Sequence, residues 1–126
     1  MSEQTLSVLA VYQSYLGKGQ LAYQYSIQAD RPVFYPREIC PYTGTGPLEW
    51  RVSKGMGTVY SVTTINAKNT EPYNVSLIDC DEGFRLMSRV EGVVPDQVKI
   101  GARVQFLRAI DDEGEFYPVF KLAETL

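Results

Sequence analysis

The first eighteen residues carry apolar side chains at intervals of three and four positions. These side chains are Leu6, Leu9, Ala10, Val11, Tyr12, Tyr15 and Leu16. The spacing places them on one face of a helix, so the pattern predicts a helix over residues 1–18. Ser2 or Thr5 is expected to cap its start, and Gly17 and Gly19 are expected to end it.

Residues 20–48 follow no regular period. Two short apolar segments, Leu21–Tyr25 and Pro32–Tyr35, are interrupted by proline and glycine. The breaking residues are Pro32, Pro36, Pro41, Gly44, Gly46 and Pro47. This composition predicts a loop-rich stretch that contains one hairpin.

From Trp50 onward, apolar and polar residues alternate with a period of two, which is typical of β-strands. The pattern predicts five strands: Thr58–Ile65, Tyr73–Asp79, Phe84–Val90, Arg103–Ile110 and Phe116–Leu122. The second of these strands places Tyr73, Val75 and Leu77 on one face.

Charged turns at Asp81-Glu82-Gly83 and Asp111–Glu115 join two pairs of these strands as hairpins, and Pro95–Val98 is expected to form a turn or a 3₁₀ piece. Five short antiparallel strands with little helix favour a mainly β fold, an OB-fold barrel, and a β-sandwich is the competing architecture. We therefore divide the chain into residues 1–48, the helix and the loop-rich segment, and residues 49–126, the barrel.

The composition excludes several classes of function. The chain has 126 residues, of which 44% are hydrophobic and 21% charged, as expected of one globular domain. It contains no histidine, which excludes a Ser-His-Asp triad, a Cys-His dyad and any metal site with histidine ligands. The net charge of -3 has the wrong sign for a general binder of phosphate backbones. Because no signal segment or long apolar run is present, we expect a cytoplasmic protein without membrane contact.

Two local patterns resemble catalytic or nucleotide-binding motifs. The carboxylates within residues 79–82 and 111–115 fall in predicted turns, so we interpret them as charged hairpin turns and not as a catalytic acid and nucleophile. The segment Ser53–Thr58 contains two glycines and a lysine, but it lacks the order of a phosphate loop and precedes a strand. Gly55 and Gly57 are instead expected to bend the chain into the barrel.

The two cysteines, Cys40 and Cys80, are too few for the disulfide framework of a small secreted domain. Cys40 is a candidate nucleophile whose pKa the nearby Arg37 can lower. Because the chain offers no histidine base, we predict that Cys40 is a structural thiol.

A series of ordered motifs between Gln24 and Leu122 resembles a known family. The motifs are Phe34-Tyr35-Pro36-Arg37, Cys40-Pro41, Leu48-Glu49-Trp50, Gly57-Thr58-Val59-Tyr60-Ser61, Pro72-Tyr73, Asp81-Glu82-Gly83, Ile100-Gly101-Ala102-Arg103-Val104 and Pro118-Val119-Phe120. The family comprises small acyl-CoA-associated OB-fold proteins with an N-terminal, rubredoxin-like zinc ribbon.

The resemblance fails at the zinc ligands. The two Cys-x-x-Cys pairs of the family's ribbon fall on Ser26, Ala29, Cys40 and Thr43, so one thiol of four remains. We therefore predict a degenerate ribbon without zinc, and no other cofactor. Because structural zinc contributes folding energy, other contacts must hold the segment together, and we propose a small apolar cluster of Tyr25, Pro32, Phe34, Tyr35 and Tyr42.

The resemblance also implies a function. Members of the family act as non-catalytic subunits beside thiolase-like enzymes or acyl-CoA hydratases and dehydrogenases, and they help to bind or channel acyl-CoA. We predict such an accessory subunit, not an enzyme, with the helix and ribbon docked on a thiolase-like partner. Because CoA carries phosphates and an adenine, the candidate ligand residues are three cations and three aromatics: Arg37, Arg51, Lys54, Tyr35, Trp50 and Tyr60. Trp50 is alternatively a core residue.

Two other functions stay open. A single-stranded nucleic-acid binder needs aromatic side chains beside a basic groove, which Tyr60, Tyr73, Phe84, Arg85 and Arg89 can supply in part. The acidic net charge argues against this alternative. A ligand-free interaction module is the other alternative, because loss of the zinc site suggests a changed role. A tyrosine-rich N-terminal third also favours self-association into a homo-oligomer.

Overall fold

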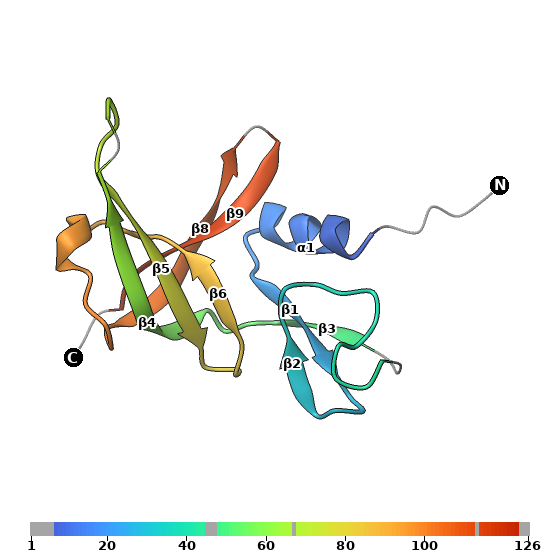
Figure 1. Cartoon of the computed structure of the whole chain (residues 1–126). Coiled ribbons are helices and arrows are strands. Elements are labelled where there is room, and N and C mark those ends of the chain that lie inside the picture. The colour runs from blue at the N-terminus through green and yellow to red at the C-terminus, as the bar shows by residue number, and fades with distance from the viewer. Residues whose placement is uncertain (1–6, 45–47, 67, 113, 124–126) are drawn as a thin grey trace.

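The computed structural model describes residues 7–44, 48–66, 68–112 and 114–123. Over these ranges the chain forms one α-helix, one short 3₁₀ helix, a three-stranded sheet and a six-stranded sheet that curls into a barrel. Figure 1 shows the barrel on one side of the molecule and the small sheet on the other, with the helix beside both. The mainly β architecture is the one that the alternating pattern predicts.

The helix α1 spans Val8–Gly17, within the predicted range. Ser7 caps it by accepting a hydrogen bond from the backbone N–H of Ala10 at 3.1 Å. The predicted caps at positions 2 and 5 lie outside the described residues. The helix ends where Gly19 adopts a positive φ of 81°, as the glycine pattern predicts.

The small sheet consists of β1 (Ala22–Ser26), β2 (Arg31–Val33) and β3 (Leu48–Val52), in the order β2-β1-β3. Strands β1 and β2 form the predicted hairpin, and β3 pairs antiparallel with the other side of β1. Residues 48–52 therefore complete the small sheet before the chain enters the barrel. The predicted division at residues 48 and 49 falls at the start of β3 and stays a prediction.

The barrel is built from β4 (Met56–Ile65), β5 (Tyr73–Cys80), β6 (Arg85–Ser88), β7 (Val90–Glu91), β8 (Arg103–Asp112) and β9 (Glu115–Leu122). Their order is β6-β5-β4-β8-β9-β7, and β7 pairs parallel with β9. Because β6 and β7 are two halves of one predicted strand, interrupted at Arg89, this pairing closes a barrel of five strands. All five predicted strands are present within a few residues of their expected bounds.

The connections are those expected, with one shorter than predicted. Pro95–Gln97 forms a 3₁₀ helix, η1, and Gly83 closes the turn after β5 through a hydrogen bond from its N–H to the carbonyl of Cys80 at 2.9 Å. The predicted turn at 111–115 shortens because β8 continues to Asp112 and β9 begins at Glu115; residue 113 lies outside the described residues.

Glycine is required where β4 begins. A Cβ atom at Gly57 would lie 2.7 Å from Cγ2 of Ile78 and 2.8 Å from the carbonyl oxygen of Asp79, so any side chain would push β4 away from β5. Gly55 has a φ of 82°, and a Cβ atom there would lie 2.9 Å from Cβ of Phe106. These two glycines let the chain turn tightly into the barrel, as predicted.

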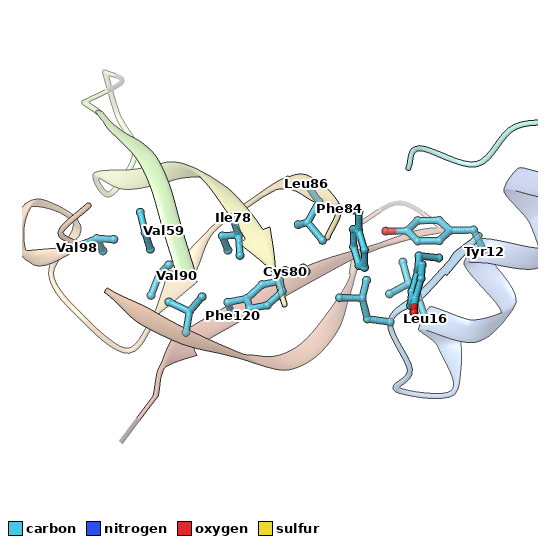
Figure 2. Close-up of a cluster of buried hydrophobic side chains, with 13 residues drawn as sticks. Tyr12, Leu16, Val59, Ile78, Cys80, Phe84, Leu86, Val90, Val98 and Phe120 are labelled. Atoms are coloured by element: carbon cyan, nitrogen blue, oxygen red, sulfur yellow. The ribbon is translucent and has the colours of Figure 1, made fainter. Parts of the chain in front are cut away.

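One continuous core joins the helix, the small sheet and the barrel. Figure 2 shows Tyr12 and Leu16 of α1 beside Phe84. From Phe84 the core extends into the barrel interior, where Cys80, Ile78 and Phe120 lie. Phe34 connects the parts, because its ring lies edge-on to Tyr12 at 5.6 Å and stacks on Phe84 at 5.0 Å.

The predicted apolar cluster of the ribbon is therefore wrong in part. Phe34 does pack on Tyr35, with ring centres 4.5 Å apart, but it also packs against the helix and the barrel. The ring of Tyr25 lies under the guanidinium of Arg51, and that of Tyr42 under the guanidinium of Arg31. The ribbon thus has no separate apolar core made of these side chains, and it draws its stability from the core that it shares with the barrel.

Candidate functional site

The candidate ligand residue Arg51 already has two partners inside the ribbon. Its guanidinium forms an ion pair with Glu49 at 2.5 Å and lies 3.7 Å from the ring centre of Tyr25. The hydrogen bond to Glu49 raises the pKa of Arg51 further. The charge of Arg51 is therefore balanced within the small sheet.

Lys54 and Arg37 are each held in the structure through their backbone. The backbone N–H of Lys54 donates to Glu82 at 2.8 Å, and Ser53 donates to the same carboxylate, which ties the ribbon to the turn after β5. The backbone of Arg37 is held by the side-chain amide of Gln24. Among the described residues, neither cation forms an ion pair through its own side chain.

The three candidate aromatic residues have different environments. Trp50 is half-buried against the core, with its ring 5.7 Å from that of Tyr15, so its interpretation as a core residue is supported. Tyr35 and Tyr60 are about half exposed. Tyr35 reaches the barrel, where its hydroxyl accepts a hydrogen bond from the N–H of Met87 at 3.2 Å.

Tyr60 is the unpaired residue of a bulge in β4, since Val59 pairs with Ile78 and Ser61 with Leu77. The guanidinium of Arg85 lies 3.5 Å from the centre of the Tyr60 ring. Asp79 holds the same guanidinium through an ion pair at 2.5 Å. This packing fixes the arginine side chain on the outer surface of the barrel.

The outer surface of β4, β5 and β6 therefore gathers four exposed large side chains around the half-buried Leu77. We call these five residues the docking face: Tyr35, Tyr60, Leu77, Arg85 and Met87. Leu77 pairs directly with Met87, whose side chain is 57% exposed. The candidate residues thus separate into two groups. Tyr35 and Tyr60 belong to the docking face, whereas Arg51 and Trp50 lie in the small sheet.

Sequence reasoning missed Leu77 and Met87. The signal was present, because β5 carries apolar residues at Tyr73, Val75 and Leu77 on one face. That face points outward, while Asn74, at an inward position, is 2% exposed. The inward and outward faces of β5 are thus the reverse of what side-chain polarity suggests.

Phe84 does not belong to any exposed surface. It is 5% exposed and stacks on Tyr23 with ring centres 4.7 Å apart. The suggestion that it offers a stacking surface to a nucleic-acid base is therefore wrong. Arg85 and Arg89 are both paired with carboxylates, Asp79 and Glu91, so the two arginines do not form a free basic groove.

The four positions that correspond to zinc ligands lie together in the ribbon. The thiol of Cys40 lies 3.2 Å from Oγ of Ser26, which also accepts a hydrogen bond from the N–H of Ala29 at 3.0 Å. Thr43 also hydrogen-bonds to Cys40. One thiol, two hydroxyls and a methyl group do not fit the donor set of structural zinc. Among the described residues, no group of three or more Cys, Asp or Glu side chains is placed to hold a metal ion.

The two thiols have opposite electrostatic environments. Burial raises the pKa of the Cys40 thiol, but hydrogen bonds with Ser26 and Thr43 outweigh burial and bring it to about 7. The predicted effect of Arg37 is not the cause. Burial, together with Glu82 and Asp81, raises the pKa of Cys80 to about 12. Both side chains are buried, so the geometry supports structural thiols.

The comparisons with known proteins agree with this geometry. The family model described as the C-terminal OB-fold domain of ChsH2 matches residues 50–108. A DUF35 domain-containing scaffold protein of Methanothermobacter thermautotrophicus is 35% identical over 91 residues, which cover 66% of this chain and 68% of that protein. The chain belongs to the DUF35 family.

Two further matches carry enzyme names. A "probable enoyl-CoA hydratase alpha subunit" of Thermomonospora curvata is 30% identical over 92 residues, which cover 70% of this chain but only 29% of that protein. A solved structure named "Ltp2-ChsH2(DUF35) aldolase" is 25% identical, with a TM-score of 0.79 over 96% of this chain and 98% of the other. The OB-fold predicted for this DUF35 protein is therefore confirmed.

The longest helix in the described part of this DUF35 protein is α1, with ten residues. That length is too short to cross a bilayer, so no described helix spans a membrane.

Proposed function

We propose that this DUF35 protein is a non-catalytic accessory subunit that docks on an enzyme of acyl-CoA metabolism. Relatives named scaffold proteins support the accessory role, and relatives named hydratase alpha subunit and aldolase support an acyl-CoA enzyme as the partner class. Within that class we propose a thiolase-like enzyme, as the family resemblance implies. The chain supplies no histidine to such a partnership.

The docking face is the observation that carries the proposal. Tyrosine, methionine and arginine are the side chains enriched in protein interfaces, and they supply most of the binding free energy there. Arg85 is held in place by Asp79 and Tyr60 before any partner binds, so docking costs little side-chain entropy. Because Asp79 balances its charge, the face is close to neutral and suits an apolar, aromatic partner surface.

The experiment compares two glutamate substitutions in a tagged protein expressed in its native cells. Met87→Glu places a charge at the centre of the docking face. Ile100→Glu places the same charge at a residue that is 70% exposed and outside the face. We expect wild type and Ile100→Glu to co-purify with an acyl-CoA enzyme at near-equal stoichiometry, and Met87→Glu to lose it at least about tenfold.

The recovered enzyme is then produced separately and mixed with each variant in size-exclusion chromatography. Equal retention by Met87→Glu and wild type would reject the docking face while leaving the accessory role intact. Recovery of no acyl-CoA enzyme by any variant would reject the accessory role itself. The same chromatography on the protein alone tests the predicted homo-oligomer.

We further propose that acyl-CoA itself contacts the predicted ligand residues, with the cations Arg37 and Lys54 beside the phosphates. Their free side chains support this assignment, because Arg51 is already paired with Glu49. Calorimetric titration with CoA tests it. Arg37→Gln is expected to weaken binding by roughly tenfold. Arg108→Gln serves as the control, because Arg108 is an exposed arginine that pairs with Glu91 and is not a predicted ligand residue. Equal affinities of both variants and wild type would remove Arg37 from the site.

A further inference from the structure

The outward face of β5 leaves apolar side chains uncovered next to the docking face. Tyr73 and Val75 lie on this face at the end of β5 remote from Asp79, and Tyr73 is 37% exposed. Leu77 is covered in part by its partner Met87. Beyond Met87, the next outward residue of the strand is Arg89, at the break between β6 and β7. An arginine thus lies beside an uncovered apolar surface.

The backbone on both sides of Arg89 is fixed. Ser88 donates to the carbonyl of Pro118 at 2.7 Å, and the side-chain amide of Asn74 forms two hydrogen bonds with the backbone of Val90. These contacts hold the strand break in one geometry. The backbone that carries Arg89 therefore belongs to the closed part of the barrel.

Only one nitrogen of the Arg89 guanidinium forms polar contacts with described residues. This nitrogen, Nη2, donates a hydrogen bond to the hydroxyl of Tyr117 at 3.1 Å and forms an ion pair with Glu91 at 3.3 Å. The Nε of Arg89 is buried and has no hydrogen-bond partner among the described residues. Glu91 also pairs with Arg108 at the shorter distance of 2.8 Å. Two arginines share one carboxylate, which leaves a net positive charge of one.

A hollow of about 380 Å³ opens beside Arg89. Its lining is Tyr73, Asn74, Val75, Met87, Ser88, Arg89 and Tyr117, so Arg89 is its one charged residue within the part of the chain that the structure describes. This volume lies within the usual range of small-molecule sites, roughly 300–1,000 Å³. A neighbouring hollow of about 610 Å³ also contacts Arg89 but is lined by Glu71 and Glu91, which repel anions.

We propose that the smaller hollow binds a small aromatic or aliphatic molecule that carries one carboxylate, with Arg89 holding the carboxylate and Tyr73 and Tyr117 flanking the apolar part. A single guanidinium matches one carboxylate in charge and in its fork of donors. A phosphate dianion or a nucleic-acid backbone needs further cations, which the lining does not contain. The inference does not rest on the docking partner, because its ligand is a small molecule, although Met87 belongs both to the docking face and to the lining of the hollow.

The test is an NMR titration of the ¹⁵N-labelled protein with 2-naphthoate, and with 2-naphthamide as the neutral analogue. We expect saturable shifts of the amide signals of Val75, Ser88 and Tyr117 with 2-naphthoate, and binding of 2-naphthamide weaker by roughly tenfold. Equal affinity for the two probes would overturn the role of the carboxylate. Shifts elsewhere on the chain, or no saturation at millimolar concentration, would overturn the site.

Two arginine variants separate the site from general surface charge. Arg89→Gln is expected to weaken 2-naphthoate binding by roughly tenfold or more. Arg31→Gln is its matched control, because the guanidinium of Arg31 also lies over a tyrosine ring, that of Tyr42, and Arg31 does not line the hollow. It should keep the wild-type affinity within about twofold. Equal losses in both variants would contradict the proposal.

A third variant keeps the test decisive if the Arg89 substitution disturbs the fold. Tyr73→Ala removes one wall of the hollow at a side chain that is already partly exposed. It is expected to weaken both probes by a similar factor, since it removes apolar contact and leaves the charge. Unchanged binding of both probes to this variant would reject the hollow as the binding site.

Discussion

The hydroxyl of Tyr35 accepts a hydrogen bond from the backbone N–H of Met87 at 3.2 Å, which joins the ribbon to the edge strand of the barrel. β6 is a terminal strand of the sheet, and the N–H of Met87 points away from β5. Unpaired groups on such an edge are templates for pairing with other chains. Tyr35 therefore protects the edge and positions the ribbon against the docking face.

Tyr35→Phe should expose this edge while keeping the ring. We expect the amide hydrogen of Met87 to exchange roughly fivefold faster, because the lost hydrogen bond contributes about 1 kcal/mol. Hydrogen exchange followed by NMR measures it. Tyr42→Phe is the control, since the hydroxyl of Tyr42 donates over a longer distance of 3.4 Å to Pro32, away from this edge. Unchanged protection of Met87 in Tyr35→Phe would show that the contact contributes nothing.

Where the barrel closes, the side chain of Asn74 forms the hydrogen bonds that the backbone of a neighbouring strand would otherwise form with Val90. Its Nδ2 donates to the carbonyl of Val90 at 2.8 Å, and its Oδ1 accepts from the N–H of Val90 at 3.0 Å. Asn74→Ala leaves both buried backbone groups unsatisfied, so we expect a loss of about 3 kcal/mol in the free energy of unfolding.

Urea denaturation measures this loss. Ser76→Ala is the matched control, because the hydroxyl of Ser76 donates a hydrogen bond to Oδ1 of Asn74 at 2.8 Å and has no hydrogen bond to the backbone of Val90 among the described residues. It should cost about 1 kcal/mol. A loss below 1 kcal/mol for Asn74→Ala would mean that water or a shifted backbone satisfies Val90 equally well.

The barrel strands were predictable because their side-chain period is local. Alternation over Tyr73–Asp79 or Arg103–Ile110 requires no knowledge of distant residues, and glycine at Gly19 and Gly57 marks turns and close approaches by itself. Local alternation does not show which face of a strand points toward the solvent. On β5 both faces carry apolar residues, and the buried one includes Asn74, so hydrophobicity alone did not identify the exposed face.

Contacts between distant segments explain most of what the sequence did not predict. Gln13 and Gln24 each hold a backbone segment through two hydrogen bonds, Gln13 to Phe116 in β9 and Gln24 to Arg37 in the ribbon. Neither partner is visible from local spacing. The pairing of Arg51 with Glu49 was accessible, however, because residues two apart on a strand share a face.

The ion pair between Asp81 and Arg103 predicts a pH dependence of stability. Two hydrogen bonds of 2.8 Å from Arg103 hold the pKa of Asp81 below its ordinary value in the folded protein. The carboxylate therefore stabilises the fold above the unfolded pKa, near 3.9, and this contribution is lost as the pH falls through the lower folded pKa. Both side chains are partly exposed, so the contribution at pH 6 is limited to about 1 kcal/mol.

Asp81→Asn tests this dependence through unfolding free energies measured between pH 2 and 7. Wild type should be more stable by about 0.5–1 kcal/mol at pH 6, and the difference should approach zero as Asp81 becomes protonated. Salt at 1 M should reduce the difference at pH 6, because it screens exposed charges. A difference that does not change with pH would assign the effect to packing and not to charge.

The ribbon predicts one designed gain of function. Ser26, Ala29 and Thr43 lie near Cys40 at the positions to which the family resemblance assigns zinc ligands, and the Cys40 thiol already lies 3.2 Å from the hydroxyl of Ser26. Replacing the three residues with cysteine should therefore create a four-thiolate site that binds one Zn²⁺ and raises the melting temperature. Elemental analysis gives the stoichiometry, and Co²⁺ substitution gives the visible spectrum of a tetrahedral thiolate site.

Wild type and a second design test whether Zn²⁺ binding requires all four thiols. Adding Cys40→Ser to the three substitutions leaves three thiols, which should bind Zn²⁺ at least about tenfold more weakly. Wild type, with one thiol, should contain no stoichiometric metal when purified without added metal. Failure of the four-cysteine design to bind Zn²⁺, in a protein that still folds, would mean that hydrogen bonds have reshaped the two ribbon turns beyond the geometry of a metal site. Stoichiometric metal in wild type would reject the prediction of a zinc-free ribbon, because other ligands would then have to complete the site around Cys40.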